Sequence, residues 1–423
     1  MDRADTAIDA LNGLRHLNPL VRAPLRRQDS TTGPLAGVPV VVKANIAVDG
    51  LPQCGASPAL ADNIATRSAT TVQRLLAAGA VIVGQANMHE LAFGITSHNP
   101  HHGPVGNPAD PGRMAGGSSG GTAAAVAGGA VPMGLASDTG GSGRLPAAMC
   151  GCVGFRPTHG RYPGDGVLTL SQSFDTVTPM ARDVAGIRAL DAVLAGVRAG
   201  TEAHAGPIRL GIVADALWEG VDAAMAEACH ARVEALARQG AEIVPLSAPD
   251  LIPAIEEIAM GIVLFETRQF WEPFLAARDM TLADFTRRIA SPDVAAVFRM
   301  VAEGAAPGEA DHARMAGPGR AAVARTLARL TADVDGLVMP TLALPAPPIG
   351  ETESCRINGV EQDLFTAITR RALVASVSGN PAISLPAGQL GGLPIGLEVI
   401  GRKGGDAALL ALAERLEGML AEG

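Results

Sequence analysis

Two serines stand 24 positions apart in this chain, and each is embedded in glycine. Ser118 lies in the segment Gly116–Gly121, and Ser142 lies in the segment Asp138–Arg144. Glycine lets backbone amides and a substrate carbonyl approach a hydroxyl group closely. Far upstream, Lys43 ends an apolar run. Serine with lysine as its base is a combination used in acyl transfer, so these residues together predict an acyl-transfer enzyme.

Each of the three residues suits one part of that chemistry. Ser142 is the candidate nucleophile, because it follows a predicted strand and Thr139-Gly140-Gly141, whose consecutive amides can form a nest for an anion. Ser118 can relay a proton between Ser142 and a base, or simply cap the helix that it precedes. Lys43 follows an apolar strand, where desolvation favours the neutral amine and makes it a competent base.

Each feature also has a simpler structural explanation when it is taken alone. Glycine–serine pairs are common in turns, and a lysine at a strand end commonly extends along the apolar surface to reach solvent. Their joint occurrence between apolar strand and helix patterns favours the catalytic interpretation, because a flexible linker would lack such patterns.

The elements around these residues alternate between strand and helix, which predicts an α/β fold whose sheet is covered on both faces. The predicted strands are 38–42, 80–84, 131–136, 208–213, 241–246, 336–340, 382–386 and 395–400. The predicted helices are 69–79, one starting at 87–91 with Asn87 as its N-cap, 118–129, 221–239 and 406–420. We expect a helical tether over 1–30 and one domain over 31–423, with a core at about 35–200 and a helical cover at about 251–330.

Composition excludes several classes of protein. The net charge is −9 without any run of five like charges, which argues against a nucleic-acid partner. The N-terminus lacks an apolar signal region, and no stretch reaches about 18 apolar residues, so we expect neither secretion nor a membrane span. The odd count of five cysteines favours free thiols in a reducing compartment and hence a cytoplasmic protein. The C-x-C pair Cys150 and Cys152 is expected to be buried.

Longer motifs give the chain a resemblance to the amidase signature family, from about residue 35 to residue 420. The segments that carry it are Gly37–Lys43, Gly116–Gly121, Asp138–Arg144, Cys150–Thr158, Met339–Thr341 with Pro345–Pro348, and Gly379–Pro386. The resemblance implies a mixed twisted sheet of about eleven strands between helices. It also implies a triad of Ser142 as nucleophile, Ser118 with a cis peptide as bridge and Lys43 as base. The amides of Thr139, Gly140, Gly141 and Ser142 would form the oxyanion hole, and neither a cofactor nor a metal is needed.

Two local segments resemble bacterial hydrolases of aryl-alkyl amides of the indoleacetamide and mandelamide kind: Asn87–Ser97, and Phe155–Thr158 with Gly160–Pro163. The resemblance therefore implies a small primary amide with an apolar or aryl-alkyl acyl group as substrate. The expected substrate-binding residues are Met88, Gly117, Gly143, Arg144 and Phe174. Gly143 stands where the family usually has isoleucine or valine, and Phe174 stands where those hydrolases often carry arginine, so both positions predict a reshaped acyl pocket.

Several alternatives stay open. Arg144 can bind an acidic group of the substrate or, as we favour, pair with Asp138. A malonamate- or biuret-like amide is an alternative substrate, and the glutaminase subunit of a tRNA-dependent amidotransferase is an alternative function. His89 is expected to be structural, and the loop cluster His98, His101 and His102 is expected to be solvated rather than metal-binding. We also expect a homodimer.

Overall fold

The computed structural model describes residues 2–198 and 203–422, and its centre is one sheet of ten strands. The sheet is mixed, as predicted, and close to the expected size of about eleven strands. Its order is β2-β1-β5-β7-β6-β13-β14-β10-β8-β9. The strands are β1 (Pro39–Lys43), β2 (Val81–Ala86), β5 (Met133–Asp138), β6 (Val153–Arg156), β7 (Thr176–Ala181), β8 (Arg209–Val213), β9 (Glu242–Leu246), β10 (Gly336–Pro340), β13 (Ala382–Leu390) and β14 (Leu393–Ile400).

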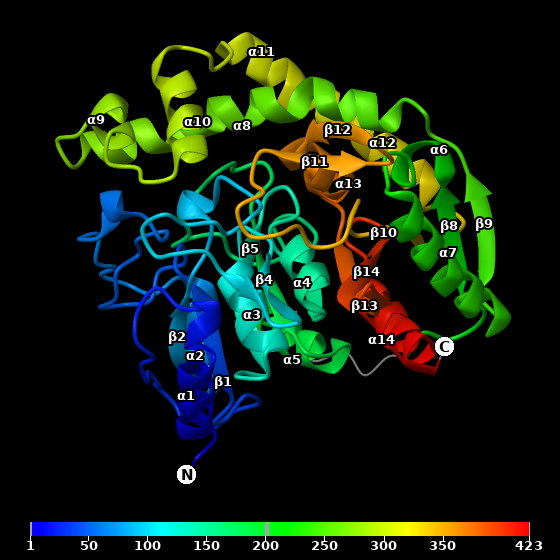
Figure 1. Ribbon diagram of the computed structural model, residues 1–423, viewed down its shortest axis with the longest axis horizontal. Coiled ribbons are helices and arrows are strands. Elements are labelled where there is room, and N and C mark those ends of the chain that lie inside the picture. Colours follow the sequence, from blue (N-terminus) through cyan, green and yellow to red (C-terminus); the bar gives the residue numbers. More distant parts are fainter. Residues whose placement is uncertain (1, 199–202, 423) are drawn as a thin grey trace.

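Parallel pairing at the two ends of the sheet encloses an antiparallel centre. Strand β1 runs parallel to both β2 and β5, and β8 runs parallel to β9 and β10. The pairings of β7 with β5 and β6, and of β13 with β6 and β14, are antiparallel. The carboxyl ends of β1 and β5 therefore meet at one edge of the sheet (Figure 1).

Helices cover both faces of the sheet. One layer contains α2 (Thr70–Ala77), α5 (Val184–Ala195), α14 (Asp406–Glu422) and α7 (Ala223–Arg238), which contact one another in that order. The other contains α1 (Arg3–Gly13), α3 (Gly120–Ala127), α4 (Arg144–Cys150) and α13 (Leu364–Ser378). A short helix, α6 (Ala214–Leu217), follows β8.

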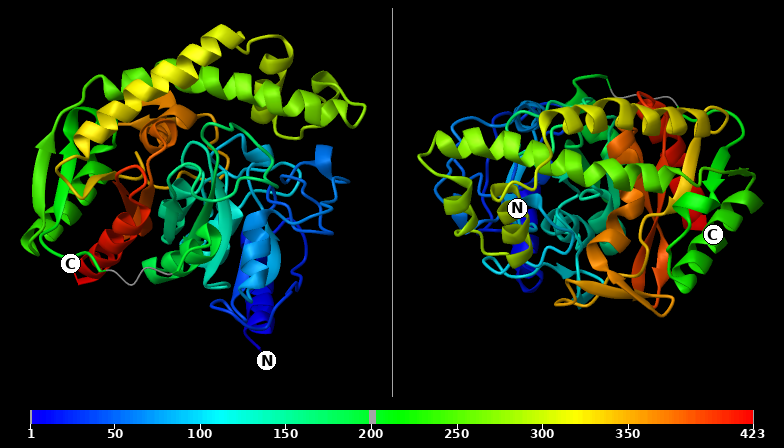
Figure 2. Two further views of the ribbon diagram at one scale, coloured as in Figure 1. Left: turned by 180° about the vertical axis from the view of Figure 1, so that it is seen from behind. Right: turned by 90° about the horizontal axis from the view of Figure 1, so that it is seen from above.

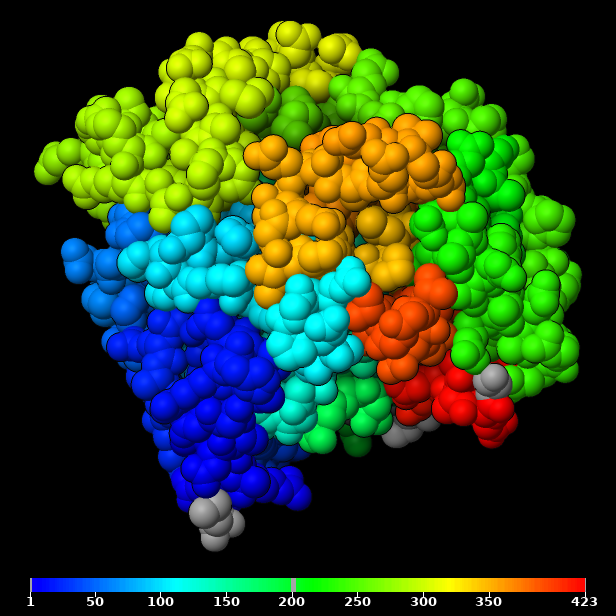
Figure 3. All heavy atoms as spheres, viewed as in Figure 1, coloured from blue at the N-terminus to red at the C-terminus, as the bar shows by residue number. Residues whose placement is uncertain are grey.

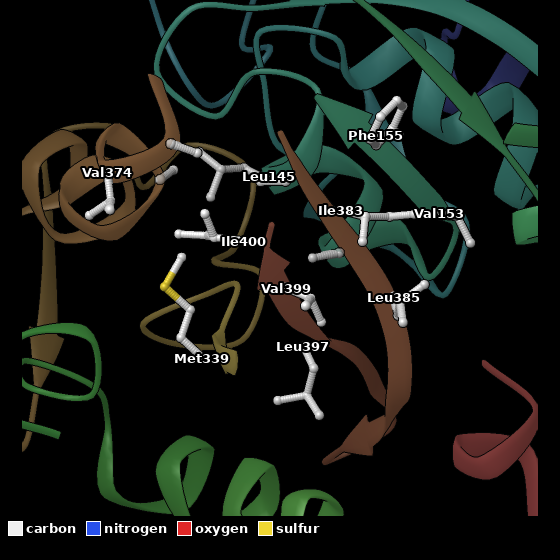
Figure 4. Packing of buried hydrophobic residues seen from close by; sticks show 14 of the residues in the cluster. Leu145, Val153, Phe155, Met339, Val374, Ile383, Leu385, Leu397, Val399 and Ile400 are labelled. Carbon is white, nitrogen blue, oxygen red and sulfur yellow. The ribbon is translucent and has the colours of Figure 1, made fainter. Parts of the chain in front are cut away.

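Side chains of β1 alternate between the two layers. Val40 and Val42 belong to the cluster that contains the α2 side chains, whereas Val41 belongs to the cluster that contains those of α1 and α3. All three valines are fully buried. A strand covered on both faces has no solvent side, which explains why it reads as a continuous apolar run. Figure 4 shows the same dense packing further along the sheet, where Phe155, Ile383 and Val399 lie together.

A helical cover, defined here as residues 251–330, runs across the width of the sheet (Figures 1 and 2). It consists of α8 (Leu251–Ala276), α9 (Leu282–Thr286), α10 (Pro292–Ala302), α11 (Glu309–Arg314), a π turn (Met315–Gly319) and α12 (Arg320–Leu330). On the face shown in Figure 3, the cover lies above the N-terminal half and beside the hairpin of β11 (Ser354–Ile357) and β12 (Val360–Asp363). A second small hairpin pairs β3 (Gly106–Asn107) with β4 (Asp110–Met114).

The predicted strands and all but one of the predicted helices are present, with boundaries shifted by a few residues. The helix predicted to start at Asn87 is wrong. Residues 87–89 belong to no helix and lead into a single 3₁₀ turn, Glu90–Ala92, in which Leu91 has a positive φ of 53°. Tertiary contacts use the backbone groups that a helix would need, since the amide of His89 donates to the carbonyl of Ser118. Asn87 caps no helix, because its side-chain amide donates to the carbonyls of Asn18 and Gly103.

The expected division into a tether and one domain stays a prediction, and its core boundary at about 200 lies outside the described residues. All five cysteines are free and buried, as expected. Within residues 2–198 and 203–422, no helix is both long and apolar enough to cross a membrane.

Candidate active site

The adjacent ends of β1 and β5 bring a buried amine close to hydroxyl groups. Lys43 is the last residue of β1, and Ser137 is the penultimate residue of β5. The Lys43 Nζ lies 2.7 Å from the Oγ of Ser118 and 2.9 Å from the Oγ of Ser137. The amide of Asn45 also donates to Ser137, at 3.1 Å. The predicted pair of Lys43 and Ser118 is thus in hydrogen-bond contact, and Ser137 is a third member that the sequence did not suggest.

Lys43 is fully buried, as the apolar strand predicted. Burial lowers the pKa of its amine to about 7, although the negative charges of Asp138 and Asp175 oppose that change. The amine can therefore act as a base: above pH 7 most of it is neutral and can accept a proton, and below pH 7 most of it is charged.

The loop before α3 holds Ser118 in place. The peptide bond between Gly117 and Ser118 is cis, as the resemblance implied. Gly117 has no room for a side chain, because a Cβ there would lie 2.8 Å from the carbonyl carbon of Ile95 and 2.9 Å from the amide of Ser97. Glycine at position 117 is therefore a packing requirement, and it fixes the position of the Ser118 hydroxyl beside Lys43.

The turn that carries Ser142 follows β5 and ends where α4 begins. Gly141 has a φ of 107°, which favours glycine, and a Cβ there would lie 2.5 Å from the Cβ of Ala372. Its amide donates to the carboxylate of Asp138 at 2.9 Å, so it is not available to a bound oxyanion as the sequence analysis expected. In the described part of the chain, the amides of Thr139, Gly140 and Ser142 have no protein acceptor.

Buried charges brace this turn from behind. Arg144 and Asp138 are fully buried and pair through Nε and Oδ2 at 3.0 Å, which is the predicted ion pair. Arg144 also pairs with Glu398, and Arg156 donates to Asp138 Oδ1 at 3.0 Å. Burial alone would raise the pKa of Asp138, but the two arginines and the Gly141 amide hold it well below its usual range. The turn therefore rests on a permanently charged carboxylate.

We expect Arg144→Met to lower the free energy of unfolding by about 3–5 kcal/mol, because it leaves buried carboxylates with one cation fewer. Urea denaturation would measure this loss. The control is Arg182→Met at an exposed arginine, where a change within about 0.5 kcal/mol is expected. A stable Arg144→Met enzyme with an increased KM would instead show that Arg144 binds substrate.

A cavity of about 270 Å³ contains Ser142 in its wall. Thr139 and Gly140 contribute to the same wall. Most of the remaining lining is apolar and comes from the segment 93–95, from the loop before β7, from α8 and from α13; it includes Phe93, Ile95, Phe174, Val263, Phe365 and Leu373. Two charged residues, Arg370 and Glu256, line it as well and pair with each other at 3.0 Å.

The expected substrate-binding residues fall into two groups. Phe174 lines the cavity, whereas Met88, Gly117, Gly143 and Arg144 are not among its lining residues. Gly143 has no space for the usual branched side chain, since a Cβ there would lie 2.3 Å from the Cγ2 of Thr178. Thr178 thus occupies the volume that the family's larger residue would need.

The histidines stay away from the Ser142 wall. His89 Nε2 lies 2.9 Å from Asp293, and its Nδ1 lies 3.2 Å from the hydroxyl of Thr96, which is consistent with a structural role. No group of three or more His, Cys, Asp or Glu side chains in residues 2–198 and 203–422 is arranged to hold a metal ion.

The chain is similar to several known proteins. A family model described as Amidase matches residues 1–410. The mandelamide hydrolase of Pseudomonas putida is 36% identical over 413 residues, which cover 92% of this chain and 80% of the relative. The indoleacetamide hydrolase of Agrobacterium vitis is 37% identical over 396 residues, which cover 90% of this chain and 83% of the relative. A crystal structure of an amidase superposes with a TM-score of 0.88 at 31% identity, over 99% of this chain and 96% of that one.

Proposed function

The chain belongs to the amidase signature family and is a hydrolase of amide C–N bonds, and we propose that its substrate is a small primary amide with an apolar, aryl-alkyl acyl group. The observation that carries this proposal is the buried contact between Lys43 and Ser118, next to a glycine turn that presents Ser142 to an apolar cavity. The names of the two relatives, mandelamide hydrolase and indoleacetamide hydrolase, point to the same class of acyl group.

The proposed reaction runs through an acyl-enzyme. Neutral Lys43 takes the hydroxyl proton of Ser118, while Ser118 takes the proton of Ser142. The Ser142 Oγ then forms a bond with the carbonyl carbon, and the amides of Thr139, Gly140 and Ser142 stabilise the oxyanion. When the C–N bond breaks, the proton returns through Ser118 to the leaving nitrogen, which departs as ammonia. Water then attacks the ester carbonyl and gives its proton to the relay of Ser118 and Lys43. The bond to the Ser142 Oγ breaks, Ser142 regains its proton from the relay, and the carboxylate is released.

The cavity lining supports an apolar acyl group. Phe93, Ile95 and Phe174 offer aromatic and aliphatic contact, and transfer of an aryl group into such a wall is favourable. The charge of Arg370 is already matched by Glu256. A carboxylated amide would have to compete with Glu256 for that arginine, so this alternative has less support.

We expect kcat/KM for phenylacetamide to exceed that for propionamide by about 10–200-fold, with malonamate and urea below both. Ammonia release by the purified chain, without added proteins, is the measurement. Val263→Trp fills the cavity and should reduce the rate for phenylacetamide at least about tenfold while changing that for propionamide by less than about threefold.

The control for that variant is Met300→Trp, at an exposed position of α10 that does not line the cavity. A preference for malonamate would contradict the proposal and assign carboxylate recognition to Arg370. Activity only in the presence of a partner protein would favour the amidotransferase subunit instead.

We also propose, as the sequence analysis expected, that the protein is cytoplasmic and forms a homodimer. Five buried free thiols support a reducing compartment. Sedimentation velocity on the purified protein would measure the oligomeric state.

A further inference from the structure

Asp175 is a carboxylate close to the candidate active site that the proposed reaction does not use. It immediately precedes β7, whose first residue pairs with Asp138 at the end of β5. Its Oδ1 accepts a hydrogen bond from the Thr139 hydroxyl at 2.6 Å. Its Oδ2 accepts from the amide of Leu170 at 2.9 Å, and the amide of Ser171 lies 3.2 Å from both oxygens.

Two of these partners, Thr139 and Leu170, line the cavity that contains Ser142, but Asp175 does not. Asp175 instead lines a second cavity of about 500 Å³, which has no wall in common with Ser142. Exposed residues such as Asp165 and Gln172 belong to this second cavity, so it opens to solvent. A single carboxylate thus connects the turn, through Thr139, with a second lining residue of the active-site cavity, Leu170.

We infer that Asp175 is a positioning residue for amide hydrolysis. It fixes the Thr139 end of the turn that carries Ser142, and it supplies a negative charge near Lys43. The inference rests on the proposed roles of Thr139, Ser142 and Lys43. Its geometric basis is that the hydroxyl of Thr139, the first residue of the turn, donates to Asp175, while the amides of Gly141 and Gly143 donate to Asp138.

The charges around Asp175 make its second role measurable. Lys43 and Arg156 both interact with it, and its negative charge opposes the lowering of the Lys43 pKa by burial. Burial raises the pKa of Asp175 itself to about 6, against the hydrogen bonds from Thr139, Leu170 and Ser171 and the charge of Arg156. The carboxylate is therefore charged above pH 6, where Lys43 begins to be neutral. Removing this charge should lower the Lys43 pKa further.

The test is a double-mutant cycle of Asp175→Asn and Thr139→Val. We expect each single variant to reduce kcat by about 10–100-fold with KM changed by less than about threefold, because a displaced turn weakens stabilisation of the transition state. The double variant should be no slower than the worse single variant. On acidification kcat/KM should fall as Lys43 becomes protonated. In Asp175→Asn this fall should occur at lower pH, and in Thr139→Val it should occur at the same pH as in the parent enzyme.

The control is Asp165→Asn, which changes another carboxylate of the second cavity. Asp165 accepts hydrogen bonds from Thr70 and pairs with Arg67, so this variant should keep the kinetic constants of the parent enzyme. Circular dichroism and thermal melting should show that all variants are folded. If Asp175→Asn does not fold, Thr139→Val decides the matter, since unchanged kcat in that variant would overturn the inference.

Chemical rescue uses the location of Asp175 on the second cavity. In Asp175→Ala, sodium formate can enter from solvent and accept the hydrogen bonds of Thr139, Leu170 and Ser171. We expect formate to restore kcat at least about tenfold, whereas sodium chloride at equal ionic strength should not. Formate should not activate the parent enzyme or Asp165→Ala.

Two further results would overturn the inference while leaving the proposed function intact. One is an Asp175→Asn enzyme with unchanged kcat and an unchanged fall of kcat/KM on acidification. The other is a cycle in which the two losses multiply. Failure of the proposed function is recognised separately, by a preference for malonamate over phenylacetamide or by retained activity in Ser142→Ala.

Discussion

Ser142→Ala should lower kcat by at least ~10³-fold and change KM by only a few-fold, because the residual rate would come from binding and from the oxyanion amides alone. The hydroxyl stands in the wall of the apolar cavity, in the same turn as the amides of Thr139, Gly140 and Ser142, which have no protein acceptor in residues 2–198 and 203–422. The measurement is single-turnover release of ammonia from phenylacetamide.

Labelling identifies the nucleophile independently of turnover. A fluorophosphonate should add once to the parent enzyme, on a peptide that contains Ser142, and should not add to Ser142→Ala. The matched control is Ser119→Ala, since the Ser119 hydroxyl donates to the carbonyl of Ser137 at 3.2 Å and should not react. An adduct on Ser119 or on Cys152 would overturn the assignment. Cys152 is a poor nucleophile because burial raises the pKa of its thiol to about 12.

Features that depend on local sequence were predictable. Lys43 ends a valine run that has no solvent face, so its burial follows from the pattern alone. The glycines at 117 and 141 are required by close contacts and by a positive φ, and the serines beside them mark the turns. The chain has only two lysines among its 33 basic residues, Lys43 and Lys403, which makes a lysine in this position more informative.

Features that depend on distant segments were not predictable. Asp175 and Ser137 are ordinary polar residues in sequence, and only the pairing of β5 with β7 and of β1 with β5 brings them to the site. The cavity wall from α8 and α13, with Val263 and Leu373, carries no motif because it is defined by packing. The failed prediction of a helix at Asn87 has the same cause, since the side-chain amide of Asn87 donates to the carbonyls of Asn18 and Gly103.

Lys43→Arg should abolish measurable activity even though it keeps a long cationic side chain. Arginine stays protonated at any accessible pH, so it cannot accept the proton of Ser118. In the parent enzyme, burial lowers the pKa of Lys43 to about 7. The neutral amine is the competent form, so kcat/KM should be level above pH 7 and fall about tenfold per pH unit below it.

The control is Lys403→Arg, at the only other lysine of the chain. Lys403 donates to the carbonyl of Ser378 at the end of α13, so an arginine there should leave the profile unchanged. Ser118→Ala should lose about as much activity as Lys43→Ala. The double variant should be no slower than the worse of the two, because residues that act as one relay fail together.

The pH profile distinguishes a base from a mere positive charge. If Lys43 only attracted the oxyanion, its protonated form would be the active one, and kcat/KM would rise on acidification and survive in Lys43→Arg. The 2.7 Å contact with Ser118 and the complete burial of Lys43 favour the opposite pH dependence, in which kcat/KM falls on acidification. A desolvated amine loses its proton readily, and the neutral amine has the hydroxyl proton of Ser118 within reach. A Lys43→Arg enzyme with near-normal kcat/KM would therefore remove the lysine from the relay and leave Ser118 without a base.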